Sequence, residues 1–187
     1  MKLSLPYRSE YPAFTLIEFL VATSVVIILS IIIMVNYEFG GHQFTLQSSG
    51  HKLAQDVSRI EEMAMAVREF RGSVPLGGYG VYFDRINYPT SYFLFADNNG
   101  DYIFDKPEII EEIRLKENIL IDHVYLGKKG KGGERQTGAT VTFSPPDPII
   151  RIDGGFEYDF IDITLRSTKT NETIIISVNK AGLIEVK

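Results

Sequence analysis

The sequence predicts an α+β protein, in which one long N-terminal helix packs on a mostly antiparallel β-sheet domain. Three observations lead to this class. Residues 19–35 form a run of 17 residues without a charge, helical spacing of apolar residues resumes at Leu53, and segments of alternating polarity follow Arg71. One long helix followed by a series of strands is typical of α+β domains.

The composition is that of a folded protein, and it argues against several classes of site. The 187 residues carry a net charge of −5, which disfavours nucleic-acid binding through bulk positive charge. Without cysteine, the chain has no disulfides, thiolate nucleophiles or Cys-ligated metals, and its three histidines lack metal-ligand spacing. No nucleophile–base pair is evident, so we expect a protein that is not an enzyme and requires no cofactor.

The charge-free run is long enough to cross a membrane as a helix. It extends back to Phe14 with Glu18 as its one charged residue, and about 20 apolar residues span the hydrocarbon core. The positive flank before it contains Lys2 and Arg8 and would stay in the cytoplasm. A secretory signal peptide is the main alternative, but it usually has a shorter apolar region and a small-residue cleavage site. We therefore expect a single-pass inner-membrane protein whose chain from Asn36 onward lies outside the cytoplasm.

The residues at the start of this run resemble a processing signal. Residues 13–18, Ala-Phe-Thr-Leu-Ile-Glu, are similar to the cleavage motif of type IV prepilins and type II secretion pseudopilins. The resemblance implies a pilin fold, cleavage by a prepilin peptidase between Ala13 and Phe14, and N-methylation of Phe14. Ala13 stands where the family usually has glycine. The implied organisation is a leader (1–13), a transmembrane and assembly helix (14–35), an amphipathic continuation weakened by glycines (36–70) and an extracytoplasmic β-rich head (71–187).

Glu18 is the candidate assembly residue. A carboxylate within an apolar span is costly and indicates a functional site by default, the alternative being that it lies at the membrane edge and reaches water. The resemblance implies that Glu18 pairs with the new amine of Phe14 on a neighbouring subunit, so that a wrong register leaves both charges unpaired. This implies a structural subunit that leaves the membrane to join other pilins or pseudopilins in a periplasmic or cell-surface filament.

Three segments of the head resemble one particular branch of this family. Residues 77–84, 91–101 and 178–184 look like the minor pseudopilin H and FimT-type branch of the family. Members of that branch are low-copy subunits at or near the filament tip, which implies a minor subunit here. The alternative function is a tip-located adhesin or DNA-binding minor pilin of an uptake machine.

The chain after the apolar run predicts one amphipathic helix and then strands. Gly40-Gly41 and then Gly50 either weaken one continuous helix or mark a kinked or melted segment. Residues 107–116 fit either a short helix or an irregular strand. The apolar stripe of the helix comprises Leu53, Val57, Ile60, Ala64, Val67 and Phe70, with Asp56 among the residues of the opposite, polar side. Strands are expected over 79–84, 91–96, 119–126, 140–143, 160–165, 173–178 and 183–186.

Two head loops are candidate ligand sites. In residues 97–108, oxygen-bearing side chains occupy positions 1, 3, 5, 9 and 12 of a calcium loop of the EF-hand type, namely Asp97, Asn99, Asp101, Asp105 and Glu108. Tyr102 stands at the position of the usual glycine and a strand precedes the loop, so a plain Asx/Gly turn is favoured over a Ca²⁺ site. A glycine-rich loop carries four basic residues that could contact DNA phosphates: Lys128, Lys129, Lys131 and Arg135. The loop has no aromatic residue for stacking on bases, so a solvated hairpin is favoured there.

Overall fold

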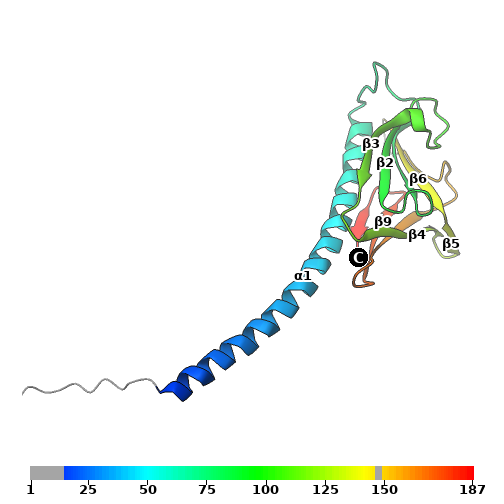
Figure 1. The fold of residues 1–187 in the computed structure, drawn as a ribbon. Helices are drawn as coiled ribbons and strands as arrows, with labels where there is room; N and C mark the ends of the chain where they lie inside the picture. Colours follow the sequence, from blue (N-terminus) through cyan, green and yellow to red (C-terminus); the bar gives the residue numbers. More distant parts are fainter. Residues whose placement is uncertain (1–14, 146–148) are drawn as a thin grey trace, which may run out of the picture. The chain divides into compact units, whose positions relative to one another are not determined.

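The computed structural model of the protein describes residues 15–145 and 149–187, apart from the side chains of residues 35–42 (Figure 1). Contacts divide the chain into two units, Met1–Gly40 and Gly41–Lys187. The elements follow one another as α1 (Leu16–Met65), β1 (Gly78–Asp84), β2 (Ser91–Asp97), the 3-10 helix η1 (Lys106–Glu108), β3 (Ile109–Arg114), β4 (Ile119–Lys128), β5 (Gly132–Gln136), β6 (Gly138–Ser144), β7 (Ile149–Ile152), β8 (Phe160–Ser167), β9 (Thr173–Asn179) and β10 (Ile184–Val186). The α+β class predicted from the sequence is confirmed.

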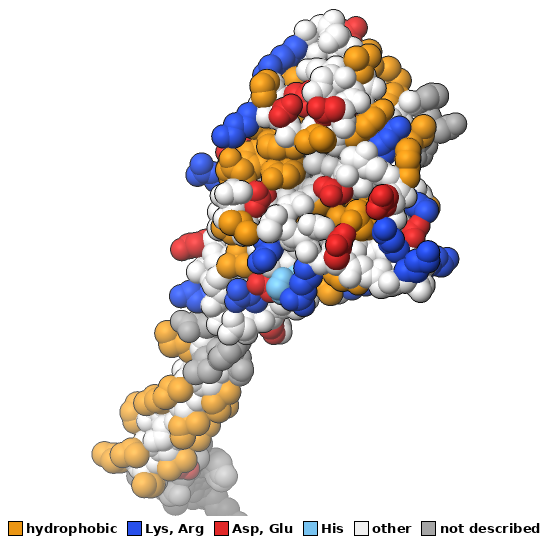
Figure 2. Space-filling view, turned by 90° about the vertical axis from the view of Figure 1, so that its right-hand side faces the viewer, with side chains coloured by type: hydrophobic (Ala, Val, Ile, Leu, Met, Phe, Trp, Pro, Cys, Tyr) orange, Lys and Arg blue, Asp and Glu red, His pale blue; other side chains and the backbone are white. Residues whose placement is uncertain are grey.

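The first unit contains the apolar part of α1. Residues Leu16–Met34 have a mean hydropathy of 2.8, and none of the segment is buried within the protein. Large apolar side chains are exposed around this part of the helix, and Figure 2 shows them in orange along it. The segment is therefore long and apolar enough to span a membrane, a property that signal sequences share.

The glycines predicted to weaken α1 do not interrupt it, because the helix is continuous from Leu16 to Met65. Close packing against β9 explains why position 50 is a glycine. A Cβ at this position would lie 2.9 Å from Cδ1 of Ile174 in β9. Glycine therefore allows the helix backbone to approach the sheet closely.

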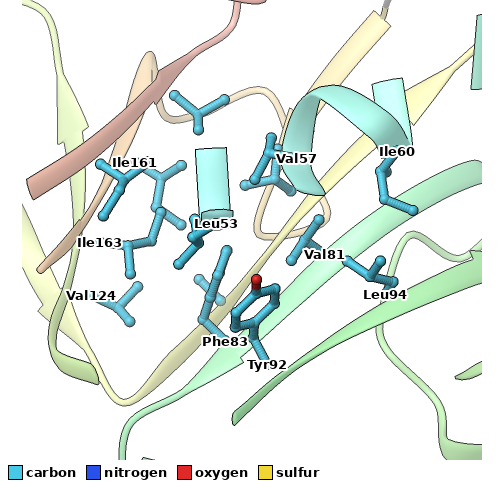
Figure 3. Packing of buried hydrophobic residues seen from close by; sticks show 14 of the residues in the cluster. Leu53, Val57, Ile60, Val81, Phe83, Tyr92, Leu94, Val124, Ile161 and Ile163 are labelled. Carbon is cyan, nitrogen blue, oxygen red and sulfur yellow. The ribbon is translucent and has the colours of Figure 1, made fainter. Parts of the chain in front are cut away.

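The C-terminal part of α1 provides the centre of the core in the second unit. Leu53, Val57, Ile60 and Ala64 are completely buried, which confirms the predicted stripe over these positions. Figure 3 shows three of them between side chains of two sheets. The labelled partners are Val81, Phe83, Tyr92 and Leu94 from one sheet, and Val124, Ile161 and Ile163 from the other.

The helix ends earlier than the apolar spacing predicted. Its last residue is Met65, and Val67 is 46% exposed with a φ of 47°. The N–H of Arg68 donates to the carbonyl of Met63 at 3.3 Å, and that of Val67 to Ala64 at 3.0 Å, which together form a Schellman motif. Phe70 lies beyond this turn and packs against the core from outside the helix.

The described strands form two five-stranded antiparallel sheets, with orders β3-β2-β1-β6-β7 and β10-β9-β8-β4-β5. All seven strands expected from the sequence are present, with small differences at their ends. The undecided segment 107–116 contains both alternatives, because η1 is followed directly by β3. The short strands β5 and β7 were not predicted.

Candidate functional site

Thr15 and Glu18 form a reciprocal hydrogen-bonded pair at the first turn of α1. The N–H of Thr15 donates to Oε2 of Glu18 at 3.0 Å, and the N–H of Glu18 donates to Oγ1 of Thr15 at 3.3 Å. The hydroxyl of Thr15 donates to the same Glu18 oxygen at 2.9 Å. This arrangement is a capping box, which satisfies N–H groups that the first helical turn leaves without partners.

The capping box gives Glu18 a local role that our sequence interpretation missed, although a threonine followed three residues later by glutamate is its usual signature. The hydrogen bonds from Thr15 engage Oε2. Glu18 is exposed, so its carboxylate can keep the cap and accept a second donor. Ala13 and Phe14, the predicted cleavage residues, lie outside the described residues.

The loop between β2 and η1 begins with a buried carboxylate. Asp97 is completely buried, and its Oδ1 accepts the N–H of Gly100 at 2.7 Å. Its Oδ2 accepts the N–H of Tyr102 at 2.8 Å. The side chain lies against Gly77, where a Cβ would come within 1.7 Å of Oδ2. Gly77 therefore makes room for the Asp97 carboxylate at the start of the loop.

Two further residues of the loop form Asx turns. Oδ1 of Asn99 accepts the N–H of Asp101 at 2.9 Å, and Oδ1 of Asp101 accepts the N–H of Ile103 at 2.8 Å. Tyr102 has a φ of 62°, so this tyrosine takes the left-handed conformation for which calcium loops use glycine. Asp105 is exposed and precedes η1.

Glu108 reaches back into the loop from its last position. The side chain is 5% exposed, and Oε1 accepts the N–H groups of Asn98 at 2.8 Å and Asn99 at 3.4 Å. Among the described residues, Oε2 of Glu108 and Oδ1 of Asn98 are buried without a hydrogen-bond partner. Burial raises the pKa of Glu108, the two backbone hydrogen bonds oppose this, and the charges of Asp97 and Asp101 raise it further.

Four of the five predicted loop ligands, Asp97, Asn99, Asp101 and Glu108, accept hydrogen bonds from backbone N–H groups of the loop. Within residues 15–145 and 149–187, no group of three or more acidic or histidine side chains is already arranged to hold a metal ion. The loop is flanked by β2, which is the strand expected before it, and by η1.

The basic segment forms the hairpin of β4 and β5. Carboxylates from the segment that precedes β8 in the same chain lie next to it. Nζ of Lys128 lies 3.3 Å from Oε2 of Glu157. The N–H of Lys129 donates to Oδ2 of Asp159 at 2.7 Å. Lys131 and Arg135 are exposed, and Glu134 lies between them in the sequence and is bonded to the hydroxyl of Tyr158. This mixed charge resembles a solvated hairpin more than a continuous basic surface.

Asp56 is a residue whose role the sequence did not reveal. It was placed on the polar side of the helix, but it is 6% exposed, and its Oδ2 accepts the hydroxyl of Tyr92 in β2 at 2.6 Å. Nζ of Lys52 lies 3.2 Å from the same oxygen. Arg59, which lies 3.9 Å from Oδ1 of Asp56, also pairs with Glu111 of β3 at 2.7 Å. Burial and the bond to Asp56 raise the pKa of Tyr92. This cluster fastens α1 to β2 and β3.

Comparison with known proteins gives no assignment. No family model, curated protein or solved structure matches the chain.

Proposed function

We propose that the protein is a structural, minor subunit of a type IV pilus or type II secretion pseudopilus. The observation that carries this proposal is the exposed apolar segment Leu16–Met34 of α1, which is continuous with the part of the same helix that is buried in the second unit. Soluble proteins rarely expose so large an apolar surface unless it contacts a membrane or other protein segments. The apolar surface of a pilin makes both contacts: it lies in the membrane before assembly and packs against neighbouring helices afterwards.

In the proposed assembly, the apolar segment of α1 acts first in the membrane and then in the filament. Before assembly, Leu16–Met34 would span the inner membrane, with the leader in the cytoplasm and the head outside. After cleavage, the same side chains would pack against the helices of neighbouring subunits. The Glu18 carboxylate, held at the first turn by Thr15, would pair with the Phe14 amine of a neighbour and set the register.

The pilin fold is part of this proposal. It is supported by a long helix whose C-terminal part supplies Leu53, Val57 and Ile60 to the core of a head built from antiparallel sheets. The branch with minor pseudopilin H and FimT-type subunits is supported by residues 77–84 and 91–101, which form β1, β2 and the start of the acidic loop.

The test is the mass of the N-terminal peptide of the membrane-expressed protein, with and without a prepilin peptidase. We expect peptidase-dependent loss of residues 1–13 and a mature chain that begins with methylated Phe14. Ala13→Gly should be processed at least as fast as the parent, whereas Ala13→Leu should remain uncut because a large side chain replaces a small one. A parent chain that still begins at Met1 in the presence of active peptidase would contradict the proposal.

The DNA-binding alternative has a direct test in the β4–β5 hairpin. Because Glu134, Glu157 and Asp159 accompany its basic residues, we expect no binding to duplex DNA at physiological salt. Binding that weakens with salt and is lost when Lys128, Lys129 and Lys131 are changed to alanine would favour the DNA-uptake role instead.

A further inference from the structure

We propose that the loop of residues 97–108 binds one Ca²⁺ ion. This inference does not depend on the proposed filament role. Five side chains would coordinate the ion. The backbone carbonyl of Ile103, at position 7 of the loop, would supply a sixth oxygen. The five are Asp97, Asn99, Asp101, Asp105 and Glu108.

The observation that points to a ligand is the buried carboxylate of Glu108. Its Oε1 is directed at the N–H groups of Asn98 and Asn99, which places the carboxylate against the beginning of the loop. Its Oε2 is equally buried but has no hydrogen-bond partner among the described residues, and neither does Oδ1 of Asn98. Both atoms are acceptors with unused lone pairs. A cation coordinated by Oε2 of Glu108 would satisfy this oxygen, whereas leaving a buried acceptor without a partner is costly.

The charge of the loop supports a cation. Three acidic side chains accompany Glu108, and none of the ion pairs formed in the described part of the chain involves a carboxylate of this loop. The N–H groups that bond to Asp97 and Asp101 leave further lone pairs on these oxygens for a metal. Asp105 is exposed, so its side chain can turn inward when an ion enters. The two oxygens of Asp101 accept the N–H of Ile103 and Nδ2 of Asn99, and they would coordinate through their remaining lone pairs.

The two ends of the loop are held in place before any ion binds. Asp97 belongs to β2 and is fixed against Gly77. Phe104 stacks on Tyr82 of β1, with ring centroids 4.3 Å apart, and lies 5.2 Å from the ring of Phe93. This anchoring fixes the second half of the loop on the outer side of the sheet, so binding orders few additional groups.

The ligand set favours calcium over other common metals. All donors are oxygens, which disfavours zinc and copper, since these metals prefer nitrogen and sulfur ligands. The exposed side chains at three of the five positions give a flexible shell, which suits the six to eight ligands of Ca²⁺ better than the strict octahedron of Mg²⁺.

The experiment is thermal unfolding of the full chain in detergent, followed by circular dichroism at neutral pH with millimolar Ca²⁺, Mg²⁺ or chelator. We expect Ca²⁺ to raise the melting temperature by about 5–10 °C over chelator, with a much smaller effect of Mg²⁺. Tb³⁺ emission excited through tyrosine provides an independent binding signal, because Tyr102 lies within the loop.

Two variants and a control complete the test. Asp101→Asn and Glu108→Gln should lose most of the calcium shift and the Tb³⁺ signal, whereas Glu117→Gln, an exposed site outside the loop, should keep both. Glu108→Gln keeps an oxygen that can accept the N–H groups of Asn98 and Asn99, so a lost calcium shift in this variant reports the missing charge and not a misfolded loop. An unchanged parent melting temperature, an equal response to Mg²⁺, or a full calcium shift in Glu108→Gln would each overturn the proposal.

Discussion

At the scale of single residues, Glu18 has a capping role and the proposed assembly role, and one truncation would remove both. Its Oε2 caps the first turn of α1 through Thr15, and its charge is available to a neighbouring amine. Glutamine keeps the capping geometry, because a glutamine amide oxygen serves equally in a capping box. Glutamine nevertheless lacks the charge that an ion pair requires.

We therefore predict that Glu18→Gln and Glu18→Ala are both cleaved normally but enter filaments about tenfold less than the parent, or worse, because the proposed pairing with the Phe14 amine of a neighbour is lost. Thr15→Ala weakens only the cap and should assemble much better than either. The measurement is the ratio of sheared filament to membrane-bound protein. Normal assembly of Glu18→Gln would show that capping, and not charge, is what the assembly needs.

Tyr92 and Asp56 form the second residue-scale feature, a hydrogen bond between a strand and the helix in which both side chains are buried. We predict that Tyr92→Phe lowers the free energy of unfolding by about 1.5–3 kcal/mol, because the buried carboxylate of Asp56 loses a donor. Chemical denaturation measures this value. Tyr88→Phe is the matched control, since the Tyr88 hydroxyl makes no hydrogen bond in the described residues, and it should change stability by less than about 0.5 kcal/mol. Equal effects of the two substitutions would show that the bond contributes little.

At the scale of elements, the C-terminal end of α1 contains a strained residue. Val67 occupies the left-handed position of the Schellman motif, which glycine normally fills, and a β-branched residue is rarely found there. We predict that Val67→Gly stabilises the protein by about 1 kcal/mol, because the left-handed conformation costs an ordinary residue roughly 1–2 kcal/mol. Val74→Gly is the control, being similarly exposed without a positive φ, and it should be neutral or destabilising. A loss of stability in Val67→Gly would mean that the valine packs more than its exposure indicates.

The same helix end explains what sequence patterns could and could not predict. Apolar spacing located the buried stripe from Leu53 to Ala64, because a helix face is set by local periodicity. The spacing continued to Phe70, however, and could not reveal that Phe70 returns to the core after a turn. Strands buried on one face were found by alternation, whereas β5 was hidden by glycines and charges and β7 is only four residues long.

In the candidate sites, features whose members are close in sequence could be predicted, whereas contacts between distant residues could not. The acidic loop and the threonine–glutamate pair were visible because their members are close in sequence. Asp56 was misplaced because its partner Tyr92 lies 36 residues away, on a strand whose contact with the helix no spacing rule encodes. The inward direction of Glu108 was likewise hidden, since it depends on how η1 turns the chain back toward Asn98.

At the scale of the whole molecule, the second unit contains a core of its own. The buried part of α1 begins at Leu46, and Nε2 of Gln43 donates to Oε1 of Glu172 at 2.8 Å. The apolar segment Leu16–Met34 contributes no buried residue to this core. The second unit therefore contains the helical stripe and both sheets without the membrane-spanning candidate.

We predict that a truncated chain beginning at Gln43 is a soluble monomer that unfolds in one cooperative transition, as seen by size-exclusion chromatography and thermal circular dichroism. A chain beginning at Arg68 is the matched control, because it keeps both sheets but loses Leu53, Val57, Ile60 and Ala64. Without that stripe, the apolar faces of the two sheets have no helix to cover them, so this shorter chain should aggregate. Aggregation of the chain from Gln43 would instead mean that the apolar segment contributes to the folding of the head.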